Sequence, residues 1–198
     1  MCSSDLWVRI DTTSALSYVS TGLVNGTAYS FRIVATNAAG EGSASVAVNA
    51  TPATTPSAPQ NVTATIADSA ITVSWSAPAS NGGSVVTSYV VETTTDGTSW
   101  TTGAATTSTV ATVSGLVNGL SYGVRVRAIN IVGSGTTSSV ISATPSGTPS
   151  APLALTPVAG NRQISLTWSA PSSDGGAGII DYLVEASANG GVAWRSVR

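Results

Sequence analysis

The chain has 198 residues, of which 42% are hydrophobic and only 8% are charged, and its formal net charge is −2. It contains no histidine, which excludes a Ser-His-Asp triad and most zinc sites. It also contains no lysine and only dispersed arginines, which argues against a nucleic-acid binder, because such proteins cluster cations against phosphates. No apolar run approaches the about 18 residues of a membrane-spanning helix.

The first six residues of the chain can be encoded by the end of a sequencing adaptor read from a GTG start. We hypothesise that they are not native, and they are too short and too polar to be a signal peptide. Cys2 has no second cysteine with which to form a disulfide, so we expect the core alone to hold the fold. The acidic, Thr- and Ser-rich composition favours an extracellular or cell-surface location.

A repeat with a spacing of 93 residues runs through the chain. Joints rich in Pro, Thr and Ser, at 50–59 and 143–152, separate its copies and predict short, semi-rigid linkers. The spacing therefore predicts a C-terminal half-repeat at 1–52, a complete repeat at 53–145 and an N-terminal half-repeat at 146–198. The matching pairs are Leu23 and Leu116, Tyr29 and Tyr122, Trp75 and Trp168, Tyr89 and Tyr182, Glu92 and Glu185, and Trp7 and Trp100, with Trp194 one residue further on.

Within the complete repeat, apolar and polar residues alternate with a period of two. The runs at 71–75, 89–92 and 122–128 each have one apolar and one mostly polar face, as half-buried antiparallel strands do. Turn-forming pairs such as Asp96-Gly97 and Asn118-Gly119 separate the runs. About seven short strands in about 90 residues predict an all-β fold, an antiparallel sandwich of two sheets.

These residues resemble the fibronectin type III family over nearly the whole chain after the first six residues. The resemblance rests on Trp75-Ser76-Ala77-Pro78, on the Tyr-x-Val-Glu run at 89–92, and on the Leu-x-x-Gly-x-x-Tyr run at 116–122. It implies tandem immunoglobulin-like sandwiches, one complete and two partial. It assigns strands C′, E, F and G to the first half-repeat, and strands A, B, C and C′ to the last.

The same resemblance implies which side chains form the core of each sandwich. Trp75 and Trp168 resemble the family's core tryptophan. Leu116 with Tyr122 resembles its tyrosine corner, in which the phenol oxygen bonds the backbone upstream. The implied core residues are Trp75, Trp168, Tyr89, Tyr182, Leu23, Tyr29, Leu116 and Tyr122.

The two half-repeats each leave an inner face uncovered. Chains of this family enter and leave a sandwich at opposite poles, and the linkers are too short to fold back along the complete domain. We therefore expect two exposed half-domains within one chain, with unpaired edges that favour pairing with other chains.

The candidate ligand contacts are Trp7, Trp100 and Trp194, because one such tryptophan recurs in each repeat near strand C′. An indole ring can stack on a sugar ring through its apolar face. The alternative interpretation, which we favour, is that each ring covers the outer face or edge of its own sheet. Nearby, we expect Glu92 to point outward and to form a cross-strand ion pair with Arg125 and Arg127 rather than to bind a ligand.

No catalytic, cofactor-binding or metal-ligating residue is predicted. Gly119-Leu120-Ser121-Tyr122-Gly123 matches the nucleophile pattern of hydrolases, but it spans a loop and a strand and has no base. The dispersed carboxylates lack the spacing of a calcium loop. We therefore predict a non-catalytic spacer or presentation module whose partners are the neighbouring domains of its polypeptide. The alternative is a carbohydrate-binding or adhesive module whose partner is a polysaccharide or a surface protein.

Overall fold

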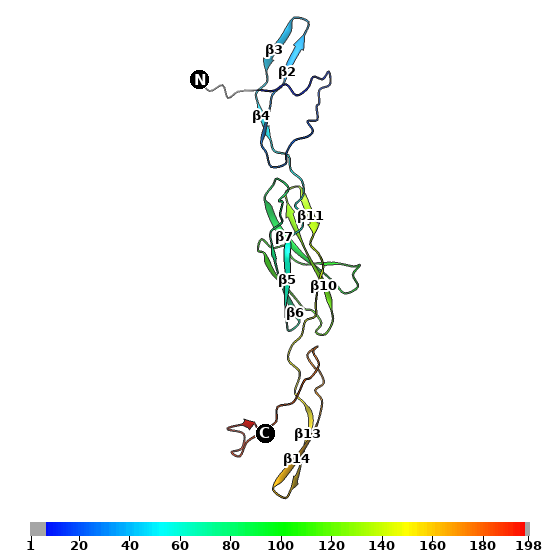
Figure 1. Ribbon diagram of the computed structural model, residues 1–198, viewed down its shortest axis with the longest axis vertical. Helices are drawn as coiled ribbons and strands as arrows, with labels where there is room; N and C mark the ends of the chain where they lie inside the picture. The colour runs from blue at the N-terminus through cyan, green and yellow to red at the C-terminus, as the bar shows by residue number, and fades with distance from the viewer. Residues whose placement is uncertain (1–6, 197–198) are drawn as a thin grey trace.

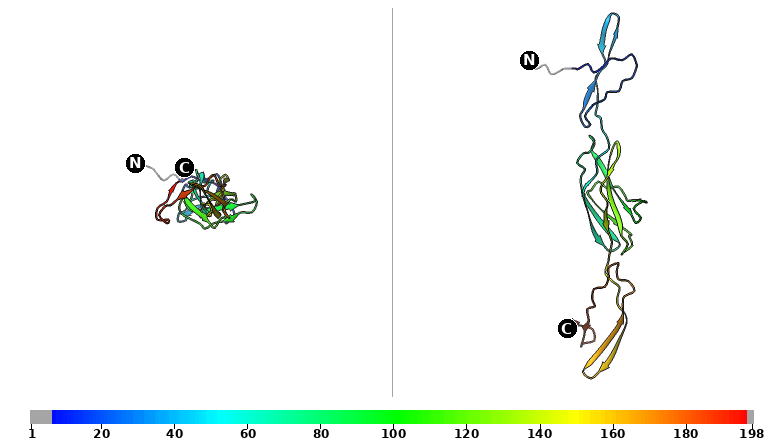
Figure 2. Two further views of the ribbon diagram at one scale, coloured as in Figure 1. Left: turned by 90° about the horizontal axis from the view of Figure 1, so that it is seen from below. Right: turned by 45° about the vertical axis from the view of Figure 1, so that its right-hand side comes forward.

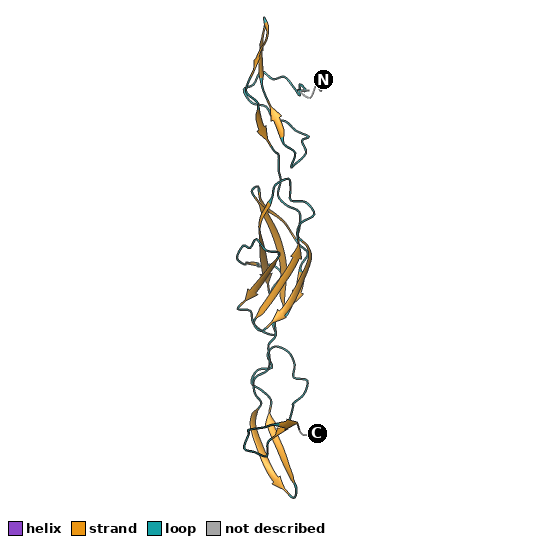
Figure 3. Ribbon diagram, turned by 90° about the vertical axis from the view of Figure 1, so that its left-hand side faces the viewer, coloured by secondary structure: helices purple, strands orange, loops and turns teal. Residues whose placement is uncertain are grey.

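The computed structural model describes residues 7–196 of the chain, so the hypothesis about the first six residues lies outside the described part. Three units follow one another along a single line, and residues 7 and 196 lie in the outer two (Figure 1). An end-on view superposes the units, and a turned view leaves them in line (Figure 2). The described residues form strands and no helix, so the predicted all-β class is confirmed (Figure 3). Within residues 7–196 there is accordingly no helix able to cross a membrane.

The central unit is a sandwich of two antiparallel sheets. One sheet has the order β5-β6-β9, and the other has the order β11-β10-β7-β8, with β12 also pairing with β10. The strands are β5 (Gln60–Ala67), β6 (Ala70–Ser76), β7 (Val86–Thr94), β8 (Thr101–Thr102), β9 (Val110–Ser114), β10 (Tyr122–Asn130), β11 (Gly133–Thr137) and β12 (Ile141–Ala143).

The core of the central unit lies between these two sheets. Along β10 buried and half-buried residues alternate without a break, and β6 follows the same period of two. The predicted alternation is therefore confirmed for both strands. The innermost side chains, all fully buried, are Ile71, Val73, Val124, Val126 and Ala128. Burying each of the larger ones contributes about 1.5–3 kcal/mol.

Within residues 7–196, the outer units contain only two-stranded sheets, and no second sheet covers them. Leu16 is 108% exposed in the first unit, and Ile180 is 96% exposed in the last. The strands are β1 (Tyr29–Phe31), β2 (Val34–Asn37), β3 (Gly40–Ala44) and β4 (Val48–Ala50) in the first unit, and β13 (Leu153–Gly160), β14 (Gln163–Ser169), β15 (Glu185–Ala186) and β16 (Arg195–Ser196) in the last.

The half-repeats form fewer strands than the resemblance implies. Residues 7–28 form no strand, although strands C′ and E were expected there, and residues 180–184 form none where strand C was expected to begin. The physical reason is the lack of partners. In the central unit β9 pairs with β6 and β7 pairs with β10, and neither half-repeat contains both members of such a pair. A strand without a neighbour leaves its backbone groups to water.

Candidate binding surface

The turn that leads from β7 to Trp100 is organised by Asp96. Its Oδ1 accepts hydrogen bonds from the backbone N–H groups of Ser99 at 2.7 Å and Thr98 at 2.8 Å. The Thr94 hydroxyl lies 3.0 Å from the same oxygen. These donors, Ser99 first, favour the charged carboxylate and hold the pKa of Asp96 well below its usual range. The turn thus fixes where the chain re-enters the sheet just after Trp100.

Trp100 lies beneath a guanidinium group on the outer face of the larger sheet. The guanidinium carbon of Arg125, on β10, is 3.7 Å from the centre of the indole ring. A cation in this position is attracted by the negative face of the ring, and it also shields that face from water. One face of the candidate ligand-contacting ring is therefore occupied by the protein's own side chain.

Glu92 on β7 holds the arginine in place. It lies directly opposite Arg125 in the strand register, and its Oε2 accepts a hydrogen bond from the Nε of Arg125 at 2.6 Å. Arg127, two residues further along β10, approaches Oε1 of the same carboxylate at 3.3 Å. The expected cross-strand ion pair is present, and it links one carboxylate to two guanidinium groups. We call Trp100, Arg125, Glu92 and Arg127 the outer-face stack.

The burial of Glu92 differs from the half-exposed position that its strand face suggests. Only 8% of the residue is exposed, and its neighbours Val90, Thr93 and Thr94 are buried as well. The cause is the cover supplied by β8 and by the two arginines, which the alternation within β7 alone does not reveal. A buried carboxylate is tolerated here because two cations neutralise it.

The first repeat contains the same pair of stacked residues. The guanidinium carbon of Arg32 lies 4.3 Å from the centre of the Trp7 ring, and both residues stand 93 positions before Arg125 and Trp100. Trp7 is 41% exposed. Arg9 and Glu41 form a separate ion pair in this unit, with both side chains more than half exposed. The stacking of arginine on the recurrent tryptophan is thus a feature of the repeat.

Trp194, the third candidate, has the most exposed ring. It is 59% exposed, and the nearby β15 and β16 pair Glu185 with Ser196, as β7 and β8 pair Glu92 with Thr102. The structure therefore places the three tryptophans at equivalent positions of three separate units and does not bring them together into one surface.

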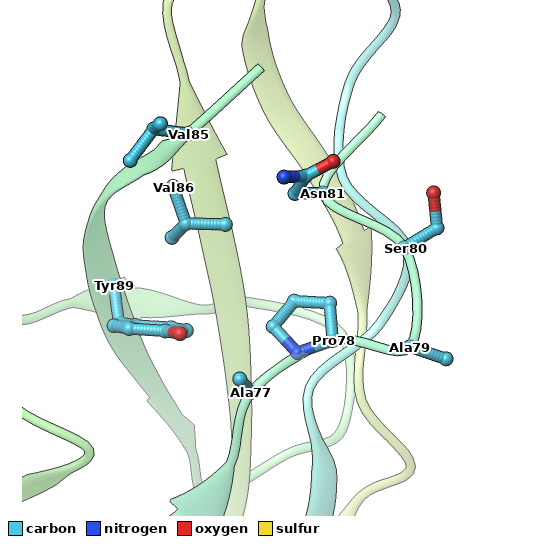
Figure 4. Close-up of a pocket in the computed structure, with 8 residues that line it drawn as sticks. All are labelled: Ala77, Pro78, Ala79, Ser80, Asn81, Val85, Val86 and Tyr89. Atoms are coloured by element: carbon cyan, nitrogen blue, oxygen red, sulfur yellow. The ribbon is translucent and has the colours of Figure 1, made fainter. Parts of the chain in front are cut away.

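A shallow depression lies between the loop that follows β6 and the start of β7. It has a volume of about 580 Å³ and is lined by Ala77, Pro78, Ala79, Ser80, Asn81, Val85, Val86 and Tyr89 (Figure 4). Its lining carries no charged side chain. The Ser80 hydroxyl and the Asn81 Oδ1 already accept hydrogen bonds from Gly82 and Gly83 within their own turn. Two of the polar atoms that could orient a ligand are therefore already engaged.

The residues assigned to the core by resemblance surround the sandwich interior in the central unit. Trp75 and Tyr89 are both 6% exposed, and their rings pack with centroids 5.5 Å apart. Tyr122 is 9% exposed, and its phenol oxygen accepts a hydrogen bond from the Val117 N–H at 3.1 Å. Leu116 packs against this core from the half-buried layer.

The same contacts recur in the outer units with less burial. Trp168 and Tyr182 pack at a centroid distance of 5.5 Å, although Tyr182 is 38% exposed. Tyr29 accepts a hydrogen bond from the Val24 N–H at 3.0 Å, and Leu23 beside it is half-buried. The local geometry of the repeat is therefore kept where the opposite sheet is lacking.

Sequence reasoning missed two features of the surface. It did not anticipate the stacking of Arg125 on Trp100, although the recurrence of both residues at a spacing of 93 was a signal that they act as a pair. It also gave no role to Asn130. The amide nitrogen of Asn130 donates to the carbonyls of Thr54 at 2.8 Å and Asn81 at 2.9 Å, which ties the linker to the neighbouring loop.

Among residues 7–196, no three His, Cys, Asp or Glu side chains come together where a metal ion would be held. The central unit is an all-β sandwich whose outer-face side chains pair with one another, and its sequence recurs along the chain. These features define a modular domain of the immunoglobulin-like class. The comparison with known families agrees, because residues 57–144 match the model of the fibronectin type III domain. Residues 57–144 therefore form a fibronectin type III domain.

The relatives of this chain are larger proteins, of which the chain matches a part. The chain is 32% identical over 193 residues to Exoglucanase B of Cellulomonas fimi, covering 89% of this chain and 17% of that protein. It is 33% identical over 190 residues to Endoglucanase B of the same organism, covering 88% and 18%. Among solved structures, a crystal structure of titin domains shares 27% identity with a TM-score of 0.52, covering 62% of this chain and 42% of that one. The chain thus spans less than a fifth of either curated relative.

Proposed function

We propose that the chain is a non-catalytic spacer, a string of sandwiches that holds other domains of its polypeptide apart. The observation that carries this proposal is the outer-face stack, in which Arg125 occupies a face of Trp100 and is itself held by the buried Glu92. A ring already covered by a bound guanidinium would have to release it before stacking on a sugar. The repetition of the pair as Arg32 on Trp7 supports a structural role.

The linear order of the units also supports the spacer (Figure 1). We propose the unit boundaries 1–52, 53–145 and 146–198, and the family match at 57–144 supports the middle unit. A sandwich adds a fixed length to the array, and its neighbours bind only at its poles. The mechanism is therefore mechanical, with the length of the array set by the number of repeats.

A second candidate function is carbohydrate binding, and two observations favour it. Two relatives are named as glucanases, and Trp194 is 59% exposed, with no arginine of residues 7–196 stacked on its ring. Both candidate functions imply a location outside the cell. The composition suits such a location, and polymeric glucan is an extracellular substrate. A binding module would use the free tryptophan faces as stacking platforms.

Co-sedimentation of the full chain with cellulose, chitin and peptidoglycan tests the proposal. The spacer predicts that the protein stays in the supernatant with each polymer, for the parent chain and for Trp100→Ala and Trp194→Ala alike. Binding to one polymer that is lost in either tryptophan variant, while circular dichroism remains that of the parent, would instead establish the carbohydrate-binding function.

A further inference from the structure

The two joints between units are built from the same pair of loops. At the first joint, residues 22–26 of one unit meet residues 80–83 of the next. At the second joint, residues 115–119 meet residues 173–176, which are their counterparts 93 positions later. We call the first member of each pair the receiving loop and the second the glycine loop. Such a match between two independent joints indicates a repeated interface.

The two loops touch through their backbones. A Cβ atom on Gly83 would lie 2.7 Å from the carbonyl carbon of Asn25, and a Cβ atom on Gly176 would lie 2.7 Å from that of Asn118. Real Cβ atoms essentially never come closer than 3.0 Å to such a neighbour. A side chain of any size at Gly83 or Gly176 would therefore force the units apart.

The linker is hydrogen-bonded to both of the units that it connects. At the first joint, the Gly26 N–H donates to the Pro52 carbonyl at 2.9 Å, and the Thr54 N–H donates to the Gly82 carbonyl at 2.8 Å. The second joint repeats both bonds, from Gly119 to Pro145 at 2.9 Å and from Gly147 to Gly175 at 2.8 Å. Each linker is thus bound to the receiving loop before it and to the glycine loop after it, which removes most of its freedom to bend.

The glycine loop is shaped in advance for this contact. Gly83 and Gly176 have φ angles of +86° and +84°, a region that residues with side chains rarely adopt. The N–H of Gly83 donates to Asn81 Oδ1 at 2.9 Å, and that of Gly176 donates to Asp174 Oδ1 at 2.8 Å. A short side chain with an acceptor oxygen, followed by two glycines, therefore forms the same turn in both units.

We propose that this contact is a docking interface by which each repeat recognises the next. The receiving loop, with its Asn-Gly tip, accepts a repeat whose corresponding loop reads Asn-Gly-Gly or Asp-Gly-Gly, and the contact fixes the angle between the two units. The partner is a neighbouring repeat of the same polypeptide. This inference deepens the proposed spacer function and rests on it, since it makes the array a rod of defined direction.

The distance between spin labels on either side of the first joint tests this interface. The full chain would carry Cys2→Ser, with labels at Val48→Cys on β4 and Thr65→Cys on β5, both exposed positions. Dilution with unlabelled chain removes distances between molecules. The interface predicts one narrow distance distribution for the parent chain, and one at least about twice as wide for Gly83→Ala, because many orientations replace one.

Gly97→Ala is the matched control. Gly97 has a φ angle of +74° in the same unit, but nothing lies within 4 Å of a Cβ atom placed there. The substitution therefore imposes similar backbone strain without touching the joint, and the distribution should stay narrow. A broad distribution in the parent chain, an unchanged one in Gly83→Ala, or equal broadening in both variants would each overturn the interface.

Co-sedimentation of the unlabelled chain distinguishes failure of the docking interface from failure of the proposed spacer function. A broad distance distribution without polymer binding would leave a flexible spacer and refute only the docking interface. Polymer binding with a narrow distribution that depends on Gly83 would refute the spacer and leave the interface in place.

Discussion

The guanidinium carbon of Arg125 lies 3.7 Å from the centre of the Trp100 ring, and the Nε of the same arginine donates to Glu92 at 2.6 Å. One cation therefore covers an aromatic face and neutralises a buried carboxylate at the same time. Trp100, one of the three candidate ligand contacts, thus has one face covered by an arginine of its own domain. This relationship decides how the surface responds to substitution.

Replacing Arg125 with alanine should destabilise the central domain by roughly 1–3 kcal/mol, because it removes a charge-assisted hydrogen bond and a cation–π contact. Arg127 alone would then have to neutralise Glu92 at a longer distance. Urea denaturation measures the loss. Arg125→Lys is the control, since it keeps the charge without the planar guanidinium group. Its free energy of unfolding should fall between those of the parent and of Arg125→Ala. An unchanged midpoint in Arg125→Ala would contradict the stack.

Replacing Tyr122 with phenylalanine should cost about 1 kcal/mol, because the Val117 N–H loses its acceptor while the ring stays packed. The substitution Tyr29→Phe removes the equivalent bond in the first half-repeat. It should leave the unfolding of the central domain unchanged. Hydrogen exchange resolved by unit distinguishes the two, and equal effects of both substitutions on the central domain would show that the bond is not local.

Replacing Asn130 with alanine should destabilise the central domain by about 2–4 kcal/mol, because four hydrogen bonds of a residue only 3% exposed are lost. Asn130→Asp keeps the acceptor for Val132 and Gly133. It places a carboxylate against the carbonyl oxygens of Thr54 and Asn81. It should be no more stable than the alanine variant. Recovery of parent stability by aspartate would show that the donated bonds to the linker do not matter.

The pH dependence of stability should reveal the contribution of the Asp96 carboxylate to the stability of the central domain. Its pKa is lowered in the folded state by the N–H groups of Ser99 and Thr98, so its contribution is present above the unfolded-state pKa, near 4, and is lost as the pH falls below it. Asp96→Asn keeps the shape of the turn without the charge. The difference in midpoint temperature between parent and variant should be largest at neutral pH and shrink on acidification. A difference that does not change with pH would contradict this.

Periodicity within single strands was sufficient to predict much of the central sandwich from the sequence. The alternation at 71–75 and 122–128 predicted the inner and outer faces of β6 and β10, since side chains alternate across a strand whatever surrounds it. The spacing of 93 matches Trp75 with Trp168 and Tyr89 with Tyr182, and in both the central and the last unit the tryptophan packs on the tyrosine with ring centroids 5.5 Å apart.

Contacts between distant segments could not be predicted from the sequence. The burial of Glu92 requires β8 and two arginines of β10 to cover β7, and this cover is set by the register of three strands. The same holds for the glycine loops. An Asn-Gly-Gly run predicts a turn, but its approach to the preceding unit depends on the path of the linker. The half-repeats lost strands for the corresponding reason, since a strand needs its partner.

The most direct test of the central claim, that Trp100 serves the domain and not a ligand, is the response of the indole N–H resonances of the full chain to soluble cello-oligosaccharides. We predict that the Trp100 resonance keeps its position at millimolar sugar and moves only when Arg125 is replaced. A saturable shift of the Trp100 resonance in the parent chain would contradict this and show that the Trp100 ring is a binding platform.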